Sequence, residues 1–256
     1  MVYNSRIQIE REEMPNWVFN TLTIQGNKSE VDYIKDKLNE PYTMEHKSWN
    51  PKTQTMELAT STYSNPVFSF WNITRPEDLE AYNTTPEHTI GQTISEMFSG
   101  NDWYSWNVRN WGTKWDVAVG DSNEYPDTVL VEHKSEGEDQ WLVYKFDTAW
   151  SPPVSALESL SELVPNCVVT LDWQEEQGFG GQMEFVRGDV TAESDYESRC
   201  YDCDAIDTME YCENDCGQIC SKCNWLGEAD LDCVAECQDH KIYLETNVPD
   251  YRMDQI

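Results

Sequence analysis

The sequence predicts an α+β sandwich, in which two helices pack against an antiparallel sheet, followed by a small module rich in cysteine. Alternating apolar side chains over residues 16–24 are typical of a strand. Apolar residues recur at helical spacing over residues 30–38 and 154–164. Eight of the nine cysteines lie between residues 200 and 237, which sets this segment apart from the rest of the chain.

The first strand and the first helix form a βα unit over residues 16–38. Ser29 is the expected N-cap of the helix, and Pro41 is expected to end it. The polar residues 42–65 are expected to be rich in turns. Residues 67–73 are aromatic and β-branched, which predicts the next strand.

The remaining elements are predicted by the same periodicities. Residues 88–111 are expected to form a helical segment that is broken at Gly100, and residues 115–119 are expected to form a short strand. Residues 128–132 and 140–146 are expected to pair as a hairpin. Residues 151–164 should form a second helix, and residues 167–173 and 183–186 should form two further strands. Pro152 and Pro153 suit the first turn of the second helix. Together these elements predict one core, formed by two helices and an antiparallel sheet.

Composition shifts along the chain suggest how it is divided. We expect a flexible N-terminal arm in residues 1–13 and an α+β domain in residues 14–187. An acidic linker in residues 188–199 would lead to a duplicated four-cysteine metal module in residues 200–240, and a C-terminal tail would follow in residues 241–256. The α+β domain holds all the predicted helices and strands. It is therefore expected to fold without the cysteine-rich module.

The charge balance is strongly acidic, with 17 Lys and Arg against 48 Asp and Glu and a net charge of −31. Such a surface repels phosphates, so direct nucleic-acid binding is not expected. The acidity has two interpretations, namely solubility or salt adaptation, and attraction to a basic partner. No apolar stretch is long enough for a membrane span and the N-terminus has no signal-peptide pattern, so a cytoplasmic location is expected.

Three sequence blocks also carry a family resemblance. They are Met14–Trp17 with Asn20–Gly26, then Asn110–Asp116, then Phe146–Pro153. In these blocks the chain resembles the YubB-type ferredoxin-like domain of phage and plasmid proteins, over about residues 14–187. The resemblance implies a ferredoxin-like sandwich of two helices on a four-stranded sheet and a setting in a phage or mobile element. It implies no catalytic residues, and the cysteine-rich tail lies outside it.

The cysteines follow a repeated pattern. Its two halves are Cys200-x2-Cys203-x8-Cys212-x3-Cys216 and Cys220-x2-Cys223-x9-Cys233-x3-Cys237. A CxxC turn presents two thiolates to one ion, and a CxxxC pair at helical spacing presents two more, so each half suits tetrahedral zinc. The segment has few large apolar side chains, so it needs a bound metal or another cross-link to fold. We therefore predict two zinc ions, with all eight cysteines as ligands.

The pairing of the cysteines has two solutions. We expect sequential use, with one ion for each half, because the repeat makes each half self-sufficient. In the alternative, a cross-braced arrangement, the two CxxC pairs share one ion. Disulfides, an iron–sulfur cluster and a redox-active CxxC are the competing interpretations of the same cysteines. Cys167 is expected to be a buried thiol of the core.

Signals of catalysis are weak. The histidines are scattered, at residues 46, 88, 133 and 240, and no serine or cysteine lies in a nucleophile motif. The aromatic residues between Trp103 and Trp115 are expected to pack in and around the core. Arg109 and Lys114 are expected to anchor nearby carboxylates. No catalytic residue is predicted.

The leading hypothesis is a non-enzymatic accessory protein of a phage or mobile element. It would bind a protein partner with a basic surface through its acidic surface and its zinc module, and one version of this hypothesis is imitation of nucleic-acid charge. The alternatives are an enzyme with an aromatic-lined pocket and a structural component of a virion. A pocket that holds convergent carboxylates and a histidine would favour the enzyme.

Overall fold

The computed structural model describes residues 16–84, 98–122, 127–200, 203–207, 209–211 and 218–223. The chain divides into two compact units. The first comprises residues 1–176 and 183–192, and the second comprises residues 177–182 and 193–256. Each unit is described by itself below. No described helix combines the length and the apolar character that crossing a membrane requires.

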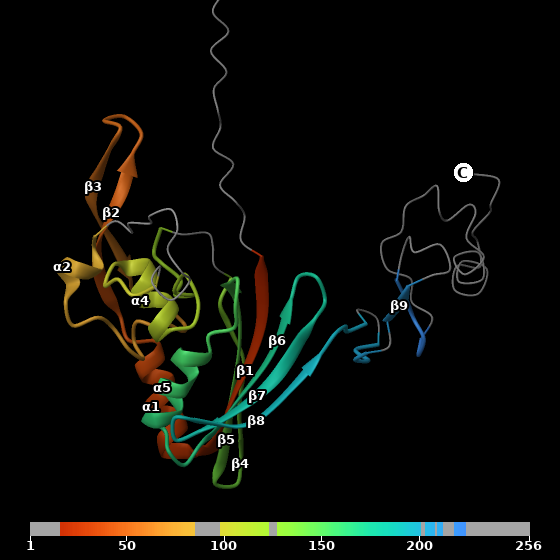
Figure 1. Cartoon of the computed structure of the whole chain (residues 1–256). Coiled ribbons are helices and arrows are strands. Elements are labelled where there is room, and N and C mark those ends of the chain that lie inside the picture. Colours follow the sequence, from red (N-terminus) through yellow and green to blue (C-terminus); the bar gives the residue numbers. More distant parts are fainter. Residues whose placement is uncertain are drawn as a thin grey trace, which may run out of the picture. The chain divides into compact units, whose positions relative to one another are not determined.

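A six-stranded sheet is the main feature of the fold (Figure 1). Its strands lie in the order β4 (Val129–Glu136), β5 (Asp139–Ala149), β1 (Trp17–Asn27), β6 (Val168–Glu175), β7 (Gly180–Val186) and β8 (Asp189–Tyr196). Helix α1 (Lys28–Leu38) follows β1, and α5 (Val154–Leu163) connects β5 to β6; both lie on one face of the sheet. The order β4-β5-β1-β6 with these two helices is ferredoxin-like, which confirms the predicted fold class. Strands β7 and β8 widen the sheet at the β6 edge.

The core lies between the sheet and the two helices. Leu22 of β1 is fully buried between Tyr144 and Leu171, its partners on the neighbouring antiparallel strands. Ile34 of α1 and Leu157 of α5 are also fully buried and belong to the same apolar cluster. Burial of each such side chain contributes about 1.5–3 kcal/mol. The alternation in β1 and the helical stripes, both visible in the sequence, therefore place the helices on the sheet.

Helix α1 begins one residue after Asn27, and not after Ser29 as the sequence suggested. The Asn27 backbone is extended, and its Oδ1 accepts a hydrogen bond from the Glu30 N–H at 3.1 Å. Ser29 lies within the first turn and donates its hydroxyl to the same Oδ1 at 2.8 Å. The N-cap prediction was wrong because Asn, an equally good cap, ends the strand directly before the helix. Pro41 follows the end of the helix as predicted.

Residues 42–65, expected to be rich in turns, form a hairpin instead. Strands β2 (Tyr42–Asn50) and β3 (Thr55–Tyr63) pair antiparallel and project from the first unit (Figure 1). At its base the rings of Tyr42 and Tyr63 stack with centroids 4.5 Å apart. The strands are rich in threonine, which favours extended backbone even where side chains face water. The polar composition concealed this hairpin, because only its base is buried.

Residues 67–73 and 115–119 were predicted as strands and are not. Phe68 and Phe70 are fully buried, so the apolar run does enter the core. Its backbone follows an irregular path, and two of its amide groups, those of Phe70 and Trp71, donate to a side chain rather than to a neighbouring strand. That side chain is Asp116, which lies within residues 115–119, the other segment predicted as a strand.

Asp116 accepts five hydrogen bonds. The donors are the backbone N–H groups of Phe70 (2.8 Å), Trp71 (3.2 Å) and Val117 (2.7 Å) and the hydroxyls of Ser69 (2.8 Å) and Tyr42 (3.2 Å). Burial raises the pKa of this carboxyl group, and the hydrogen bonds act in the opposite direction. Asp116 thereby joins the base of the β2–β3 hairpin to two irregular segments.

The other predicted elements agree with the structure. The β4–β5 hairpin, α5, β6 and β7 lie where the periodicities placed them. Helix α4 (Trp103–Asn110) is the second piece of the predicted helical segment, whose first piece falls on residues outside the described part of the chain. Asp102 caps α4 by accepting the N–H of Ser105 at 3.0 Å. A single further turn, α2 (Leu79–Tyr82), precedes it.

Strand β8 lies within the segment that was expected to be an acidic linker. Arg187 and Gly188 have φ angles of 56° and 88°, the conformation of a tight two-residue hairpin turn. This turn reverses the chain and pairs β8 with β7. All side chains of β8 except Tyr196 are exposed. Backbone pairing and the turn therefore form the strand, and its polar side chains gave no signal of it.

A chain that ends after Arg187 is expected to stay folded with a modest loss of stability. It keeps both helices, four core strands and β7, whose Met183 and Phe185 are buried, whereas β8 contributes mostly exposed side chains. Thermal unfolding followed by circular dichroism should show one cooperative transition in this form as in the full chain. A molten or aggregating fragment would instead show that later residues complete the core.

Candidate metal centre

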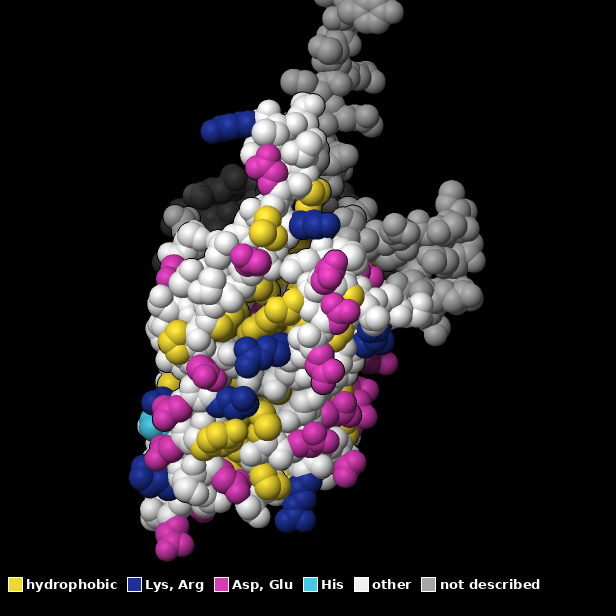
Figure 2. Space-filling view, turned by 90° about the vertical axis from the view of Figure 1, so that its left-hand side faces the viewer, with side chains coloured by type: hydrophobic (Ala, Val, Ile, Leu, Met, Phe, Trp, Pro, Cys, Tyr) yellow, Lys and Arg dark blue, Asp and Glu magenta, His cyan; other side chains and the backbone are white. Residues whose placement is uncertain are grey.

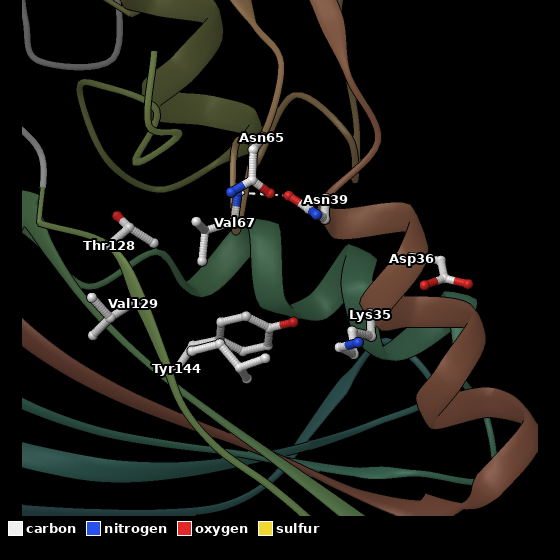
Figure 3. Close-up of a pocket in the computed structure, with 9 residues that line it drawn as sticks. Lys35, Asp36, Asn39, Asn65, Val67, Thr128, Val129 and Tyr144 are labelled. Atoms are coloured by element: carbon white, nitrogen blue, oxygen red, sulfur yellow. Dashed lines mark hydrogen bonds between the residues drawn. The ribbon is translucent and has the colours of Figure 1, made fainter. Parts of the chain in front are cut away.

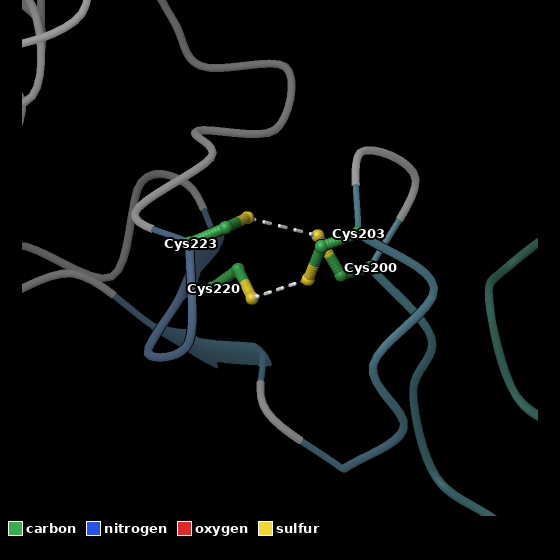
Figure 4. A group of neighbouring side chains, drawn as sticks. All are labelled: Cys200, Cys203, Cys220 and Cys223. Atoms are coloured by element: carbon green, nitrogen blue, oxygen red, sulfur yellow. Dashed lines mark hydrogen bonds between the residues drawn. The ribbon is translucent and has the colours of Figure 1, made fainter.

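Four cysteine side chains of the second unit converge (Figure 4). The Sγ atoms of Cys200, Cys203, Cys220 and Cys223 all lie within 4.8 Å of one another. The Cys200 and Cys223 sulfurs are 3.6 Å apart, and those of Cys203 and Cys220 are 3.8 Å apart. Cys200 and Cys220 are fully buried, and the other two are half-buried. The cluster is thus shielded from water on one side.

These separations suit a single tetrahedral ion. With a metal–sulfur bond of about 2.3 Å, tetrahedral geometry places ligand sulfurs about 3.8 Å from one another. The two measured separations, 3.6 and 3.8 Å, agree with this value. A disulfide needs about 2.05 Å, so neither pair is bonded. A cluster of several irons would hold four thiolates farther apart, because its own atoms lie between them.

The first CxxC turn is held in a closed loop. The N–H of Cys200 donates to the Ala205 carbonyl at 2.9 Å, and the N–H of Asp204 donates to the Cys200 carbonyl at 3.0 Å. Asp204 has a φ of 55°, a left-handed conformation that Asp tolerates better than most residues. An antiparallel bridge between Arg199 and Ile206 closes the loop. These bonds hold together the backbone on either side of Cys200 and Cys203.

Asp207 braces this loop from outside. Its carboxylate accepts hydrogen bonds from the N–H groups of Glu197 at 2.7 Å and Ser198 at 3.3 Å, and its own N–H donates to the Ser198 carbonyl at 2.8 Å. Its φ of 52° is also left-handed. Among the many acidic residues of this segment, Asp207 therefore has a structural role that its sequence context did not reveal.

A short hairpin positions the second CxxC turn. Strand β9 (Met209–Tyr211) pairs antiparallel with β10 (Gln218–Cys220), and Met209 is opposite Cys220. The chain turns directly after Cys220, which brings Cys223 back toward the first pair. Two turns, each at the end of a paired segment, thus face one another across the candidate site.

The arrangement is cross-braced. The sequential pairing that the repeat suggested would have joined Cys200 and Cys203 to Cys212 and Cys216, whereas the structure brings the two CxxC pairs together. The signal for this was present in the sequence, since 16 residues separate Cys203 from Cys220, a spacing typical of zinc sites. Cys212, Cys216, Cys233 and Cys237, also predicted as ligands, lie outside the described residues.

Cys167 is a buried core thiol, as predicted. It is 1% exposed, and its sulfur lies 3.5 Å from the Glu30 carboxylate. Burial raises the pKa of this thiol to about 12, and the Glu30 carboxylate acts in the same direction. The thiol therefore stays protonated and unreactive at neutral pH.

The aromatic residues predicted to pack in and around the core do so. Trp111 is 2% exposed and packs on Phe70 with ring centroids 5.8 Å apart. Two cations lie nearby. Lys114 Nζ lies 4.4 Å from the ring centroids of both Trp115 and Trp150, and Arg109 donates to the carbonyls of Phe98 and Gly100. Aromatic faces lie close to Lys114, and backbone oxygens accept from Arg109.

The described histidines lie in separate hairpins. His46 Nε2 is 2.9 Å from the Ser61 hydroxyl, and His133 Nε2 is 3.3 Å from Gln140 Oε1. His88 and His240 are outside the described residues. The Ser61–His46 contact has the spacing of a nucleophile and its base, but His46 Nδ1 faces the Lys47 carbonyl at 3.5 Å rather than a carboxylate. Among the described residues, this pair therefore lacks the third member of a hydrolase triad.

Comparisons with known proteins agree with the fold. Residues 114–214 match the model of the ferredoxin-like domain in Api92-like protein. The crystal structure of a protein api92 from Yersinia pseudotuberculosis is similar at 13% sequence identity and a TM-score of 0.37, over 73% of this chain and 100% of that chain. No curated protein matches the chain significantly. The match to the family model supports a ferredoxin-like domain over residues 114–214, whereas the finer YubB-type resemblance stays a prediction.

Proposed function

We propose that the protein is a non-enzymatic recognition protein, in which a zinc-stabilised module that follows a ferredoxin-like domain in the sequence presents an acidic surface to a protein partner. The observation that carries this proposal is the set of four cysteine sulfurs at tetrahedral spacing. Four thiolates fill the coordination of zinc, and a site without an open position is structural rather than catalytic. The metal then fixes the shape of a segment that has little apolar core of its own.

The charge supports a basic partner. Residues 189–256 contain 18 acidic and 4 basic side chains, a net charge of −14. Zinc-bound thiolates add further negative charge, because each Zn²⁺ balances only two of its four ligands. Acidic side chains are also spread over the face of the protein in Figure 2, with fewer Lys and Arg among them. A surface of this kind steers basic surfaces toward it.

The partner in this proposal has a basic surface, and a specific version has the acidic module occupying the nucleic-acid channel of a host protein. The YubB-type resemblance motivates a phage or mobile-element setting, with action in the host cytoplasm. The remaining four cysteines would hold a second zinc ion. Partners captured by the tagged protein from host cells and identified by mass spectrometry provide the reagents for a quantitative test.

Charge reversal within the module should weaken binding to such a partner. The exposed residues Glu193, Asp195, Glu197 and Asp204 are replaced together by lysine, while Asp207 is kept because it braces the loop. We expect the dissociation constant to rise at least about tenfold at low salt and less at high salt, since screening weakens charge pairs. Calorimetry at two salt concentrations measures both effects.

The matched control reverses four exposed acids of the first unit, Glu40, Glu77, Glu136 and Glu138, which changes the net charge by the same amount. Its affinity should fall much less. Equal losses in the two variants would indicate non-specific attraction, and an unchanged affinity in the module variant would remove the module from the binding surface. Zinc content measured on both variants shows that the metal centre is intact.

A further inference from the structure

A cavity of about 370 Å³ lies in the first unit, between the C-terminal end of α1 and strands β4 and β5 (Figure 3). Its lining combines an apolar wall with several polar groups, from Lys35, Asp36, Asn39, Asn65, Val67, Thr128, Val129, Leu130 and Tyr144. The volume lies at the lower end of the range of small-molecule sites. The cavity is remote in sequence from the cysteines and uses none of their chemistry.

Tyr144 places a polar atom on the floor of this cavity. The side chain is only 1% exposed, and its ring packs on Phe68 with centroids 5.1 Å apart. Within the described residues its hydroxyl makes no hydrogen bond, and Figure 3 shows the hydroxyl directed toward the Lys35 side of the cavity. The hydroxyl faces the open space of the cavity, where a bound acceptor atom can take its hydrogen bond in place of water. Burial raises the pKa of Tyr144, so the hydroxyl keeps its proton as a donor.

Two opposite charges lie at the mouth, on consecutive residues of α1 whose side chains leave the helix in different directions (Figure 3). Lys35 and Asp36 are adjacent in the last turn of α1 and both line the cavity. The carboxyl end of a helix attracts positive charge, and Asp36 adds to that attraction, whereas Lys35 offers an ammonium group to an anion. A ligand with net negative charge would be repelled by a protein of net charge −31. A ligand that carries one charge of each sign avoids this repulsion and fits both residues.

The backbone at the cavity is strained. Val67 has a φ of 63°, which is unfavourable for a β-branched residue, and its N–H donates to Asn39 Oδ1 at 2.9 Å. That hydrogen bond fixes Val67 in the wall and also fixes the orientation of the Asn39 amide. Strain of this kind is held in place where a wall must have a defined shape, as in binding sites.

We propose that this cavity binds a small zwitterion of the α-amino acid class. The ligand ammonium group would lie at Asp36 and the end of α1, and its carboxylate at Lys35. Its side chain would lie along Val67 and Val129, with an acceptor atom that takes the hydrogen bond of Tyr144. The amide of Asn39 adds a further polar contact at the mouth.

Ligand-observed NMR with the standard amino acids, each at about 1 mM, tests the proposal on the full chain, and calorimetry follows for those that bind. We expect at least one amino acid to bind with a dissociation constant between about 10 μM and 1 mM. The methyl ester and the N-acetyl derivative of that amino acid each lack one charge, and both should bind at least about tenfold more weakly.

Two variants locate the site. Tyr144→Phe should weaken binding about tenfold without lowering the melting temperature, because no protein hydrogen bond is lost. Its matched control is Tyr33→Phe, at a half-exposed tyrosine of α1 that does not line the cavity. Lys35→Met should weaken binding of the amino acid while leaving binding of its methyl ester unchanged.

The proposal is overturned if no amino acid binds, if Tyr144→Phe and Lys35→Met both bind as tightly as the unaltered protein, or if the ester binds as tightly as the parent. Chemical-shift changes in labelled protein that centre on residues 35–39 and 128–130 would support this placement. Changes confined to the cysteine segment would contradict it.

Discussion

Replacing Cys220 by serine is expected to unfold the cysteine segment while the ferredoxin-like domain stays folded. Cys220 is fully buried and supplies one of the four convergent sulfurs. Metal binding contributes on the order of 10 kcal/mol in small zinc modules, which is comparable to the stability of a whole domain. The sequence of the segment contains few large apolar side chains with which to replace this contribution. Addition of a strong chelator to the unaltered protein should have the same effect.

Limited proteolysis with mass spectrometry measures this effect, since cleavage should appear between residues 197 and 223 in the variant. The matched control is Lys222→Ser, an exposed position within the same CxxC turn that supplies no sulfur. That control should remain protected. If Cys220→Ser were as protected as the unaltered protein, metal ligation would not be what folds this segment.

Asp116→Ala should lower the free energy of unfolding of the ferredoxin-like domain by about 4 kcal/mol. The substitution leaves three backbone N–H groups and two hydroxyls without their acceptor. Each buried donor left without a partner costs about 1–3 kcal/mol, reduced where water can reach the space. Asp116→Asn should also be destabilising, because its amide hydrogens face donors. Urea unfolding followed by tryptophan fluorescence measures the change.

The control is Asp121→Ala. Asp121 also accepts a backbone N–H and a hydroxyl, both from Ser64, at 2.8 and 2.7 Å, but its side chain is exposed. Water can replace these bonds, so the loss should stay below about 1 kcal/mol. A loss of that small size in Asp116→Ala would mean that the irregular segments around it are held by apolar packing alone.

The sequence predicted those elements whose side chains divide between core and solvent. In β1 and α5 the buried residues recur with periods of two and about 3.6, and both elements lie where these periods place them. In the hairpin β2–β3, half-buried and exposed side chains alternate near the base, but few of the half-buried ones are large and apolar. The side chains of β8 are exposed except for Tyr196, so no periodicity marks that strand. Backbone pairing and turn geometry form these strands, and neither leaves a strong signal in composition.

The prediction of a strand over residues 67–73 was wrong for the opposite reason. The run is apolar enough for a buried strand, but a carboxylate distant in sequence, Asp116, accepts the N–H groups of Phe70 and Trp71. Such a side-chain interaction can be found only when the fold is known. Tyr144 is similar, because its position in β5 predicts burial but not a hydroxyl that faces a cavity.

The candidate metal site was predictable in its residue types and only partly in its pairing. The spacing of the cysteines indicated metal ligation, and the repeat suggested two self-sufficient halves. The loop around Cys200 and the hairpin that ends at Cys220 instead bring two CxxC turns face to face. Hydrogen bonds of the intervening residues, Asp207 among them, decide this outcome, and the repeat pattern contains no information about them.

The most direct test of the shared site is the metal content of Cys203→Ser, Cys223→Ser and the double variant. Protein purified under reducing conditions should contain about two zinc ions per chain by elemental analysis if the other cysteines hold the second ion. Cross-bracing predicts that each single variant loses about one ion and that the double variant loses the same one. If each single variant lost one ion and the double variant lost both, the sequential pairing would be correct instead. Metal-free protein with four disulfides would contradict the metal centre itself.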